Sequence, residues 1–135
     1  MSNVKDGSAF ENELVKILGE RGMWASIFPK ADDGSQPADI IAVNRLGKHL
    51  IDAKVCSNKR FVFSRAEDNQ RSSMDFFKRR AEGMGWFAVK YPDGTIYMLP
   101  KAYIEYKEQI GDKSVGEIAE YYKLEYWLNV YCDIK

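Results

Sequence analysis

Two apolar strands joined by a short turn constrain the fold of this chain more than any other feature. Residues 40–43 form a continuous apolar run, which is typical of a strand buried on both faces. Residues 44–47 read Asn-Arg-Leu-Gly, a turn sequence, and a second strand is predicted over residues 49–55. Because the connection is so short, we expect the two strands to be antiparallel neighbours in one sheet.

The remaining predicted elements surround this pair of strands. Apolar residues at helical spacing predict helices over residues 8–21 and 66–82. Short strands are predicted over residues 24–28 and 61–63, and a hairpin over residues 86–99. The order helix, three strands, helix, two strands predicts an α/β fold in which helices flank a mixed β-sheet.

The length of the chain, 135 residues, fits one domain with one core. Residues 1–104 contain the predicted sheet and both helices. Residues 105–135 form a C-terminal extension rich in Tyr and Glu, which we expect to be partly helical and to pack on the same domain. Its last segment, residues 126–131, is compatible with a strand or a helix.

Composition excludes several classes of protein. Hydrophobic residues make up 45% of the chain and charged residues 30%, which is typical of a globular domain and not of a disordered one. No apolar run approaches the roughly 20 residues of a membrane span, and residues 1–6 lack the apolar segment of a secretory signal. We therefore expect an intracellular, cytoplasmic protein without a membrane partner. With one histidine and two separated cysteines, Cys56 and Cys132, we expect neither a disulfide scaffold nor a Cys/His zinc site.

The net charge of zero hides an uneven distribution of charge. Residues 45–80 contain 10 basic and 4 acidic side chains, a net charge of +6, whereas the segments on both sides are acidic. A basic block of this kind can supply a phosphate-binding surface. It is also compatible with a solvated, lysine-rich face.

Acidic side chains are predicted to gather at one end of the two central strands. Because side chains alternate along a strand, Asp52 and Lys54 point to the same face. Asp39 opens the preceding strand, so antiparallel pairing brings Asp39 and Asp52 together. Two adjacent carboxylates are costly unless a cation neutralises them, and Mg²⁺ prefers oxygen ligands of this type.

One polar residue on each predicted helix adds to this group. Glu11 shares a helix face with Leu14 and Leu18, which predicts that it faces the core. The alternative is an acid of the first helical turn, stabilised there by the helix dipole. Gln70 heads the apolar face of the second helix, where its amide can position a water or a phosphate, and the alternative is a half-buried structural glutamine.

This set of residues resembles the PD-(D/E)xK nuclease superfamily, and in particular the Holliday junction resolvases of the archaeal Hjc type and the bacterial RecU type. Residues 7–14 are similar to their glycine-led first helix with its catalytic glutamate. Residues 34–42 are similar to the serine-containing loop that leads into the first metal-binding aspartate, although the motif reads Pro-Ala-Asp and not Pro-Asp. Residues 52–54 read Asp-Ala-Lys where these families have Glu-x-Lys.

The resemblance continues downstream. Residues 67–70 are similar to the Gln-bearing helix of the resolvases, and residues 83–89 to the glycine-led strand that follows it. In all, it covers about residues 5–100, and the chain beyond about residue 105 has no counterpart among these motifs. The small size and this unplaced tail suit a phage-encoded enzyme that acts in the host cytoplasm.

The resemblance implies a restriction-endonuclease-like fold with an α-β-β-β-α-β-β core and a metal-dependent endodeoxyribonuclease. It implies that Glu11, Asp39 and Asp52 hold Mg²⁺, or Mn²⁺ in its place. Lys54 would orient the attacking water or stabilise the charge that develops on the phosphorus, and Gln70 would be a further catalytic group. The predicted DNA-binding residues are Ser35, Lys59, Arg60, Arg65, Arg71, Lys78, Arg79 and Arg80.

The resemblance further implies a homodimer that makes paired, symmetric nicks in branched DNA, namely four-way junctions. The residues themselves leave three alternatives open: a nuclease of the same superfamily that acts on other DNA structures or on duplex, a catalytically inactive nucleic-acid-binding module, and an α/β domain whose acids only form surface ion pairs. Aromatic residues that would suit an interface, with core packing as the alternative, are Phe76, Tyr103, Tyr106, Tyr121, Tyr122, Tyr126 and Trp127.

Overall fold

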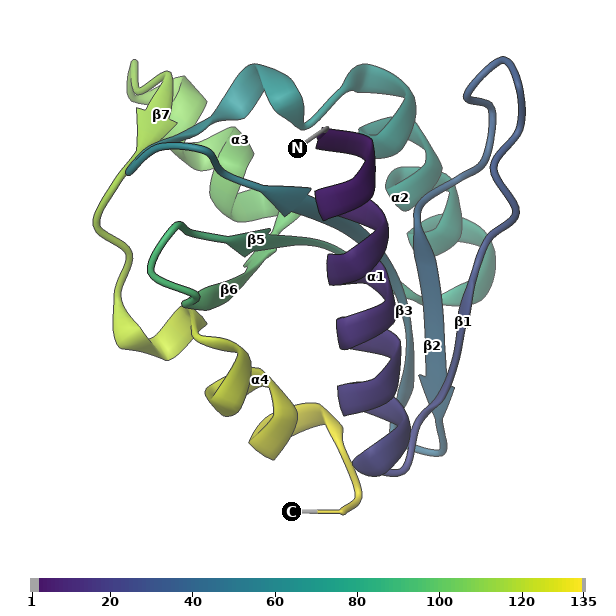
Figure 1. The fold of residues 1–135 in the computed structure, drawn as a ribbon. Coiled ribbons are helices and arrows are strands. Elements are labelled where there is room, and N and C mark those ends of the chain that lie inside the picture. The colour runs from purple at the N-terminus through teal and green to yellow at the C-terminus, as the bar shows by residue number, and fades with distance from the viewer. Residues whose placement is uncertain (1–2, 135) are drawn as a thin grey trace.

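The computed structural model of the protein describes residues 3–134, and side chains from residue 7 onward (Figure 1). Its elements in chain order are α1 (Asn3–Glu20), β1 (Trp24–Ile27), β2 (Ile40–Asn44), β3 (Gly47–Val55), β4 (Phe61–Val62), a 3-10 helix (Phe63–Arg65), α2 (Asp68–Ala81), β5 (Met84–Lys90), β6 (Ile96–Pro100), α3 (Lys101–Gln109), β7 (Ser114–Val115), a second 3-10 helix (Glu120–Tyr122) and α4 (Leu124–Tyr131).

The predicted central pair, β2 and β3, is antiparallel, with Ile40 opposite Ile51. Asn44 closes the turn between them, because its side-chain oxygen accepts hydrogen bonds from the backbone N–H groups of Leu46 and Gly47. The main sheet has the strand order β1-β2-β3-β5-β6, in which β3 and β5 are parallel and the other neighbours antiparallel. Strands β4 and β7 form a separate two-stranded sheet. The mixed sheet flanked by helices confirms the predicted fold class.

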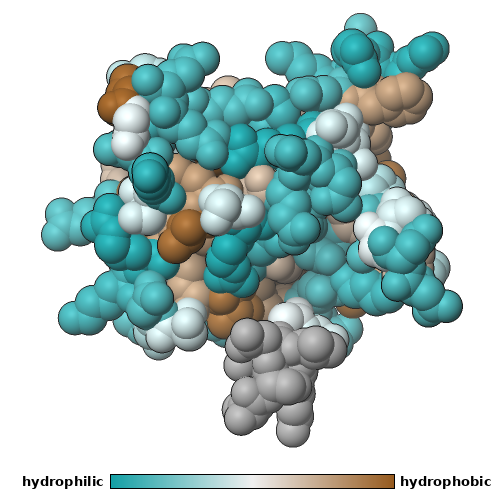
Figure 2. Space-filling model, turned by 90° about the horizontal axis from the view of Figure 1, so that it is seen from above, coloured by the Kyte–Doolittle hydropathy of each residue, from teal (hydrophilic) through white to brown (hydrophobic). Residues whose placement is uncertain are grey.

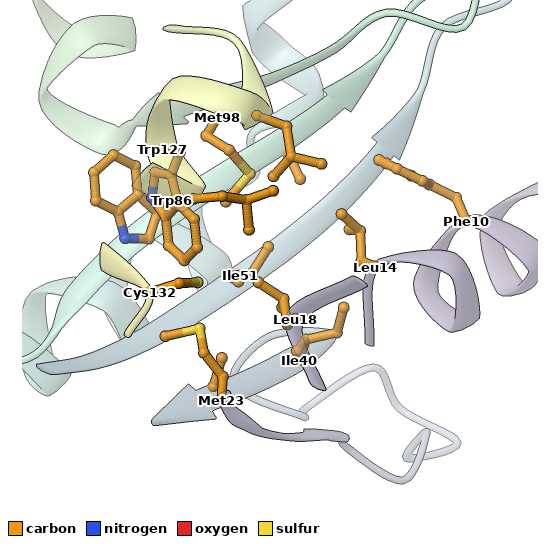
Figure 3. Close-up of a cluster of buried hydrophobic side chains, with 14 residues drawn as sticks. Phe10, Leu14, Leu18, Met23, Ile40, Ile51, Trp86, Met98, Trp127 and Cys132 are labelled. Atoms are coloured by element: carbon orange, nitrogen blue, oxygen red, sulfur yellow. The ribbon is translucent and has the colours of Figure 1, made fainter. Parts of the chain in front are cut away.

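Helices α1 and α4 cover one face of the main sheet. Leu14 and Leu18 of α1 pack with Ile51 of β3, Trp86 of β5 and Trp127 of α4 in one buried cluster (Figure 3). Trp127, which the sequence offered as an interface residue, is thus a core residue. The segment predicted as a C-terminal extension therefore supplies core side chains to the same sheet as α1.

Helices α2 and α3 cover the opposite face. Met74 of α2 and Ile104 of α3 pack there with Phe87 and Leu99 of the sheet. A Cβ atom on Gly85 would overlap the Met74 side chain, so the glycine allows α2 to lie close to β5. Within residues 3–134, no helix has the length and apolar character needed to span a bilayer.

Element boundaries differ from the sequence prediction at both major helices. Helix α1 begins at Asn3, so Glu11 lies in its middle and not in its first turn, which excludes a helix-dipole role. Helix α2 begins at Asp68 because Glu67 caps it, and residues 126–131 are helical. Cys56 and Cys132 are buried thiols, each packed in one of the two hydrophobic clusters.

The amino end of β3 contains a buried aromatic cluster. His49 is 1% exposed, and its Nδ1 accepts a hydrogen bond from the Trp86 indole N–H at 2.9 Å. The imidazole ring also contacts the rings of Trp127 and Tyr131 edge-on. Burial lowers the pKa of His49 to about 4, so the imidazole is neutral in the folded protein at pH 7.

Candidate active site

The predicted site residues converge at the carboxyl end of β3. Asp39 directly precedes β2, and its Oδ2 accepts a hydrogen bond from the Ala53 backbone N–H at 2.8 Å. Figure 2 shows this end of the molecule from above, where hydrophilic side chains prevail. A cavity of about 200 Å³ lies here, lined by Gly7, Glu11, Asp39, Ala53, Lys54, Val55, Arg65 and Gln70.

Asp52 is the most deeply buried acid of the site. Its side chain is 2% exposed, and the Lys54 ammonium lies 3.0 Å from its Oδ2. That oxygen has no well-aligned hydrogen-bond donor among the described residues. Burial raises the pKa of Asp52 to about 7; Lys54 acts against this shift, and neighbouring Asp39 adds to it. A buried acid that titrates near neutrality is typical of a functional site.

Lys30 links the other two acids of the site. Its ammonium lies 2.7 Å from Asp39 Oδ1 and 3.0 Å from Glu11 Oε1. Burial raises the pKa of Glu11, and the hydrogen bond from Lys30 counteracts this shift. Burial acts to lower the pKa of Lys30, but the hydrogen bonds to Asp39 and Glu11 outweigh it and raise that pKa. No periodic pattern in the sequence pointed to Lys30, since it lies in a polar loop between β1 and β2.

The chemistry of this donor set fits a hard divalent cation. Glu11, Asp39 and Asp52 are carboxylates, the ligand type of Mg²⁺, and a cation, the Lys30 ammonium, already lies between two of them. The buried Asp52 Oδ2 is a further oxygen without a well-aligned donor. The residues from 3 to 134 do not present three such side chains already arranged around one point. A metal ion held by all three carboxylates would therefore require these side chains to move from their present positions.

Three more of the predicted residues lie at this end of the sheet. The Gln70 side-chain oxygen accepts a hydrogen bond from the Glu67 backbone N–H at 3.0 Å, which fixes Gln70 in the first turn of α2, at the cavity wall. Arg65 donates to the Val55 carbonyl at 2.9 Å. Ser35 follows Gly34, whose carbonyl lies 3.4 Å from its donor on Asn69 of α2. Gln70 and Arg65 thus line the cavity with the carboxylates, whereas Ser35 is placed near the start of α2 and does not line the cavity.

Of the predicted DNA-binding residues that follow β3, some have exposed side chains that DNA could contact, and others are bonded within the protein. Lys59 and Arg60 are exposed beyond the carboxyl end of β3, although Arg60 donates to the Ser114 hydroxyl at 2.8 Å. Arg71 departs from its predicted role, because it donates to the carbonyls of Ala66 and Phe63 and forms a two-pronged ion pair with Glu108. Arg71 therefore connects α2 to α3.

Lys78, Arg79 and Arg80 do not flank the site, contrary to the sequence prediction. Helix α2 starts at the site and runs to the opposite end of the sheet, where Lys48, near the start of β3, donates to the Ala81 carbonyl. A rise of 1.5 Å per residue places Arg80 about 15 Å beyond Gln70 along the helix axis. The basic block of the sequence is therefore split between the two ends of the molecule.

The comparison with protein families identifies the class of protein to which the chain belongs. Residues 2–132 match the model of the archaeal Holliday junction resolvase (Hjc) family. The chain belongs to this family. Membership identifies it as a nuclease of the junction-resolving, structure-specific class. The match also includes most of the tail that the sequence motifs left unplaced.

A solved structure of the family supports the same fold. The chain is similar to Hjc of Archaeoglobus fulgidus, described as a Holliday junction resolvase from an archaeal hyperthermophile and determined at 1.6 Å resolution. The two chains share 18% sequence identity and a TM-score of 0.62 over 81% of this chain and 85% of the other. This likeness confirms the restriction-endonuclease-like arrangement. No curated protein matches the chain significantly.

Proposed function

We propose that this member of the Hjc family is a Mg²⁺-dependent endonuclease that makes paired, symmetric nicks in four-way DNA junctions. The observation that carries the proposal is the convergence of Glu11, Asp39, Asp52 and Lys54 at one end of β3. Carboxylates and one lysine beside a cavity are the groups that metal-assisted phosphodiester hydrolysis requires.

Each side chain of the site has a proposed role. Glu11, Asp39 and Asp52 would hold the metal, which supplies Lewis acidity and a bound water of lowered pKa. Lys54, whose ammonium lies 3.0 Å from Asp52, would donate to the phosphate as negative charge develops on it. The Ala53 backbone N–H orients Asp39 from the strand itself, so that the ligand geometry depends on β3 and not on a loop.

DNA contacts at this end are proposed for Ser35, Lys59, Arg60 and Arg65, with Gln70 positioning the scissile phosphate. Contacts of this kind fix the register of the protein on DNA without reading its sequence. Because two nicks on opposite strands need two sites, we also propose a two-fold homodimer, as the family resemblance implies. Sedimentation velocity of the purified chain, alone and with a junction, measures that state.

The decisive experiment compares two DNA substrates of the same sequence. A labelled four-way junction and a linear duplex are incubated with the protein in Mg²⁺ and in EDTA. The variants are Asp52→Asn and, as a matched control, Asp75→Asn, which alters an exposed acid of α2. We expect paired nicks in the junction alone, lost in EDTA and in Asp52→Asn but kept in Asp75→Asn. Equal cutting of the duplex would favour a nuclease of broader substrate range, and no cutting would favour an inactive DNA-binding module.

A further inference from the structure

Lys30 contacts two acids of the site, Glu11 and Asp39, although neither the sequence motifs nor the family match assigns it a role. Its ammonium contacts both oxygens of Glu11, at 3.0 and 3.1 Å, and Asp39 Oδ1 at 2.7 Å. The Lys30 side chain is 48% exposed, whereas those of Glu11 and Asp39 are 9% and 14% exposed. An accessible lysine therefore reaches from a loop onto two largely buried carboxylates.

The positive charge of Lys30 offsets the repulsion between the carboxylates of Glu11 and Asp39. Two carboxylates placed together away from water repel each other, and an opposite charge within hydrogen-bond distance offsets that repulsion. Lys54 is engaged with Asp52, so Lys30 is the cation that serves Glu11 and Asp39.

A metal ion and the Lys30 ammonium compete for the same carboxylate oxygens. Mg²⁺ binds carboxylate oxygens at 2.0–2.1 Å. An ammonium 2.7 Å from Asp39 Oδ1 and 3.0 Å from Glu11 Oε1 occupies the space between those oxygens and carries the same sign of charge. Occupation by one cation therefore disfavours binding of the other.

The loop that carries Lys30 can release it without disturbing the sheet. Its own bonds are local, from the Ala31 N–H to the Gln36 side chain and from the Ser35 N–H to Asp33. The bond of Phe28 N–H to the Asp39 carbonyl closes the base of the loop, and the contact of Gly34 with Asn69 is long, at 3.4 Å.

We propose that Lys30 is the resident counter-ion of the metal-free site, a positioning residue that holds Glu11 and Asp39 together until a divalent cation displaces it. The inference rests on the proposed function for the ligand roles of these two acids. It predicts that Lys30 weakens metal binding in the wild type, and that its ammonium becomes accessible when metal enters.

Calorimetric titration with Mn²⁺ tests the first consequence. We expect Lys30→Gln to bind Mn²⁺ about tenfold more tightly than the wild type, the scale of one charge-assisted hydrogen bond. Lys30→Arg keeps the cation and should bind like the wild type. The matched control is Lys16→Gln, which removes the same charge from an exposed position of α1. Equal or weaker binding by Lys30→Gln would overturn the inference.

Amine labelling of the wild type tests the second consequence without any variant. Brief acylation followed by mass spectrometry should show Lys30 labelled several-fold faster in Mg²⁺ than in EDTA, with Lys16 unchanged. Unchanged labelling of Lys30 in a protein that binds metal would overturn the inference alone. If the wild type binds no Mn²⁺, or binds it equally well after Asp52→Asn, the proposed metal site is wrong and the inference falls with it.

Discussion

The two ends of strand β3 hold two buried polar side chains in opposite ways. At the amino end, His49 is 1% exposed, accepts a hydrogen bond from Trp86 and is enclosed by aromatic rings. At the carboxyl end, Asp52 is 2% exposed, lies beside a second acid, and has one oxygen without a well-aligned donor. Each side chain also has one buried atom without a hydrogen-bond partner among the described residues, Nε2 in His49 and Oδ2 in Asp52. The His49 imidazole is neutral at pH 7, whereas Asp52 lies between two ionisable neighbours, Lys54 and Asp39.

This difference in surroundings indicates which end of β3 contributes to the stability of the fold and which end is suited to a functional site. The neutral imidazole is enclosed by aromatic rings, whereas Asp52 lies beside a second carboxylate that adds to the cost of its charged form. Residues that violate the rules of stability concentrate at functional sites. By this criterion, we expect the active site at the carboxyl end of β3 and a structural core at its amino end.

The largest expected effect separates the two ends by activity. Asp52→Asn should lower the rate of junction cleavage roughly a thousandfold, about 4 kcal/mol of barrier, because it removes a proposed metal ligand. His49→Leu should cleave at close to the wild-type rate when measured below its unfolding temperature. Single-turnover cleavage at saturating protein measures both. A His49→Leu variant that folds but does not cleave would contradict the division of roles.

The next effect separates them by stability. His49→Leu should lower the free energy of unfolding by about 1–3 kcal/mol, because it leaves the buried Trp86 N–H without its acceptor. Asp52→Asn should leave the metal-free protein as stable as the wild type or more stable at pH 8, because the raised pKa of Asp52 means that burial of its charged form costs more than the ion pair with Lys54 returns. Urea denaturation in EDTA measures both, with the exposed Arg79→Gln as a control. A loss of stability in Asp52→Asn equal to that in His49→Leu would remove the distinction.

A smaller effect concerns the basic residues at the two ends. Replacing both Lys59 and Arg60 by Gln should weaken junction binding about tenfold and reduce its salt dependence, because two proposed phosphate contacts are lost. The same change at Arg79 and Arg80, at the far end of α2, should have a clearly smaller effect. Binding measured across a salt series compares the two pairs. Equal losses would mean that DNA also contacts the amino end of β3.

The smallest expected effect is the pH dependence of the free energy of unfolding of the metal-free wild type. It is small because Asp52 and His49 change this free energy in opposite directions as pH rises. The raised pKa of Asp52, about 7, makes the folded state bind a proton above pH 4, so stability falls as pH rises toward 7. The lowered pKa of His49, about 4, makes the unfolded state bind a proton first, so stability falls as pH drops from 6.5.

The variants Asp52→Asn and His49→Leu separate these two contributions between pH 4.5 and 6.5, because each variant removes one of them. Stability should rise with pH in Asp52→Asn, where Asp52 no longer opposes the contribution of His49, and fall with pH in His49→Leu. Urea denaturation in EDTA across this range gives both slopes, and slopes of the same sign would refute the assignment.

The sequence predicted the centre of the site because local rules determine it. Alternation along β3 and the short turn after β2 are enough to bring Asp39 toward Asp52, and the helical face of Leu14 and Leu18 is enough to turn Glu11 inward. The roles assigned to these residues in catalysis remain predictions that the experiments above test.

Other features depend on contacts that no local pattern encodes. Lys30 lies in a loop without periodicity, and only the folded chain places its ammonium against Glu11 and Asp39. Arg80 is close to Gln70 in sequence, yet a helix between them carries it away from the site. Trp127 was a candidate for an exposed interface in the sequence, but in the structure it is buried in the core.

The shared core of α1 and α4 has a consequence for the order in which the protein is made. Leu18 and Cys132, from opposite ends of the described chain, belong to one buried cluster, and Arg21 donates to the Ile134 carbonyl at 2.6 Å. A chain still emerging from the ribosome lacks α4, so the helix that carries Glu11 has no complete support until synthesis has passed residue 132. Assembly of the carboxylate site is thereby delayed until α4 has been synthesised, and we expect a product that ends before α4 to lack nuclease activity.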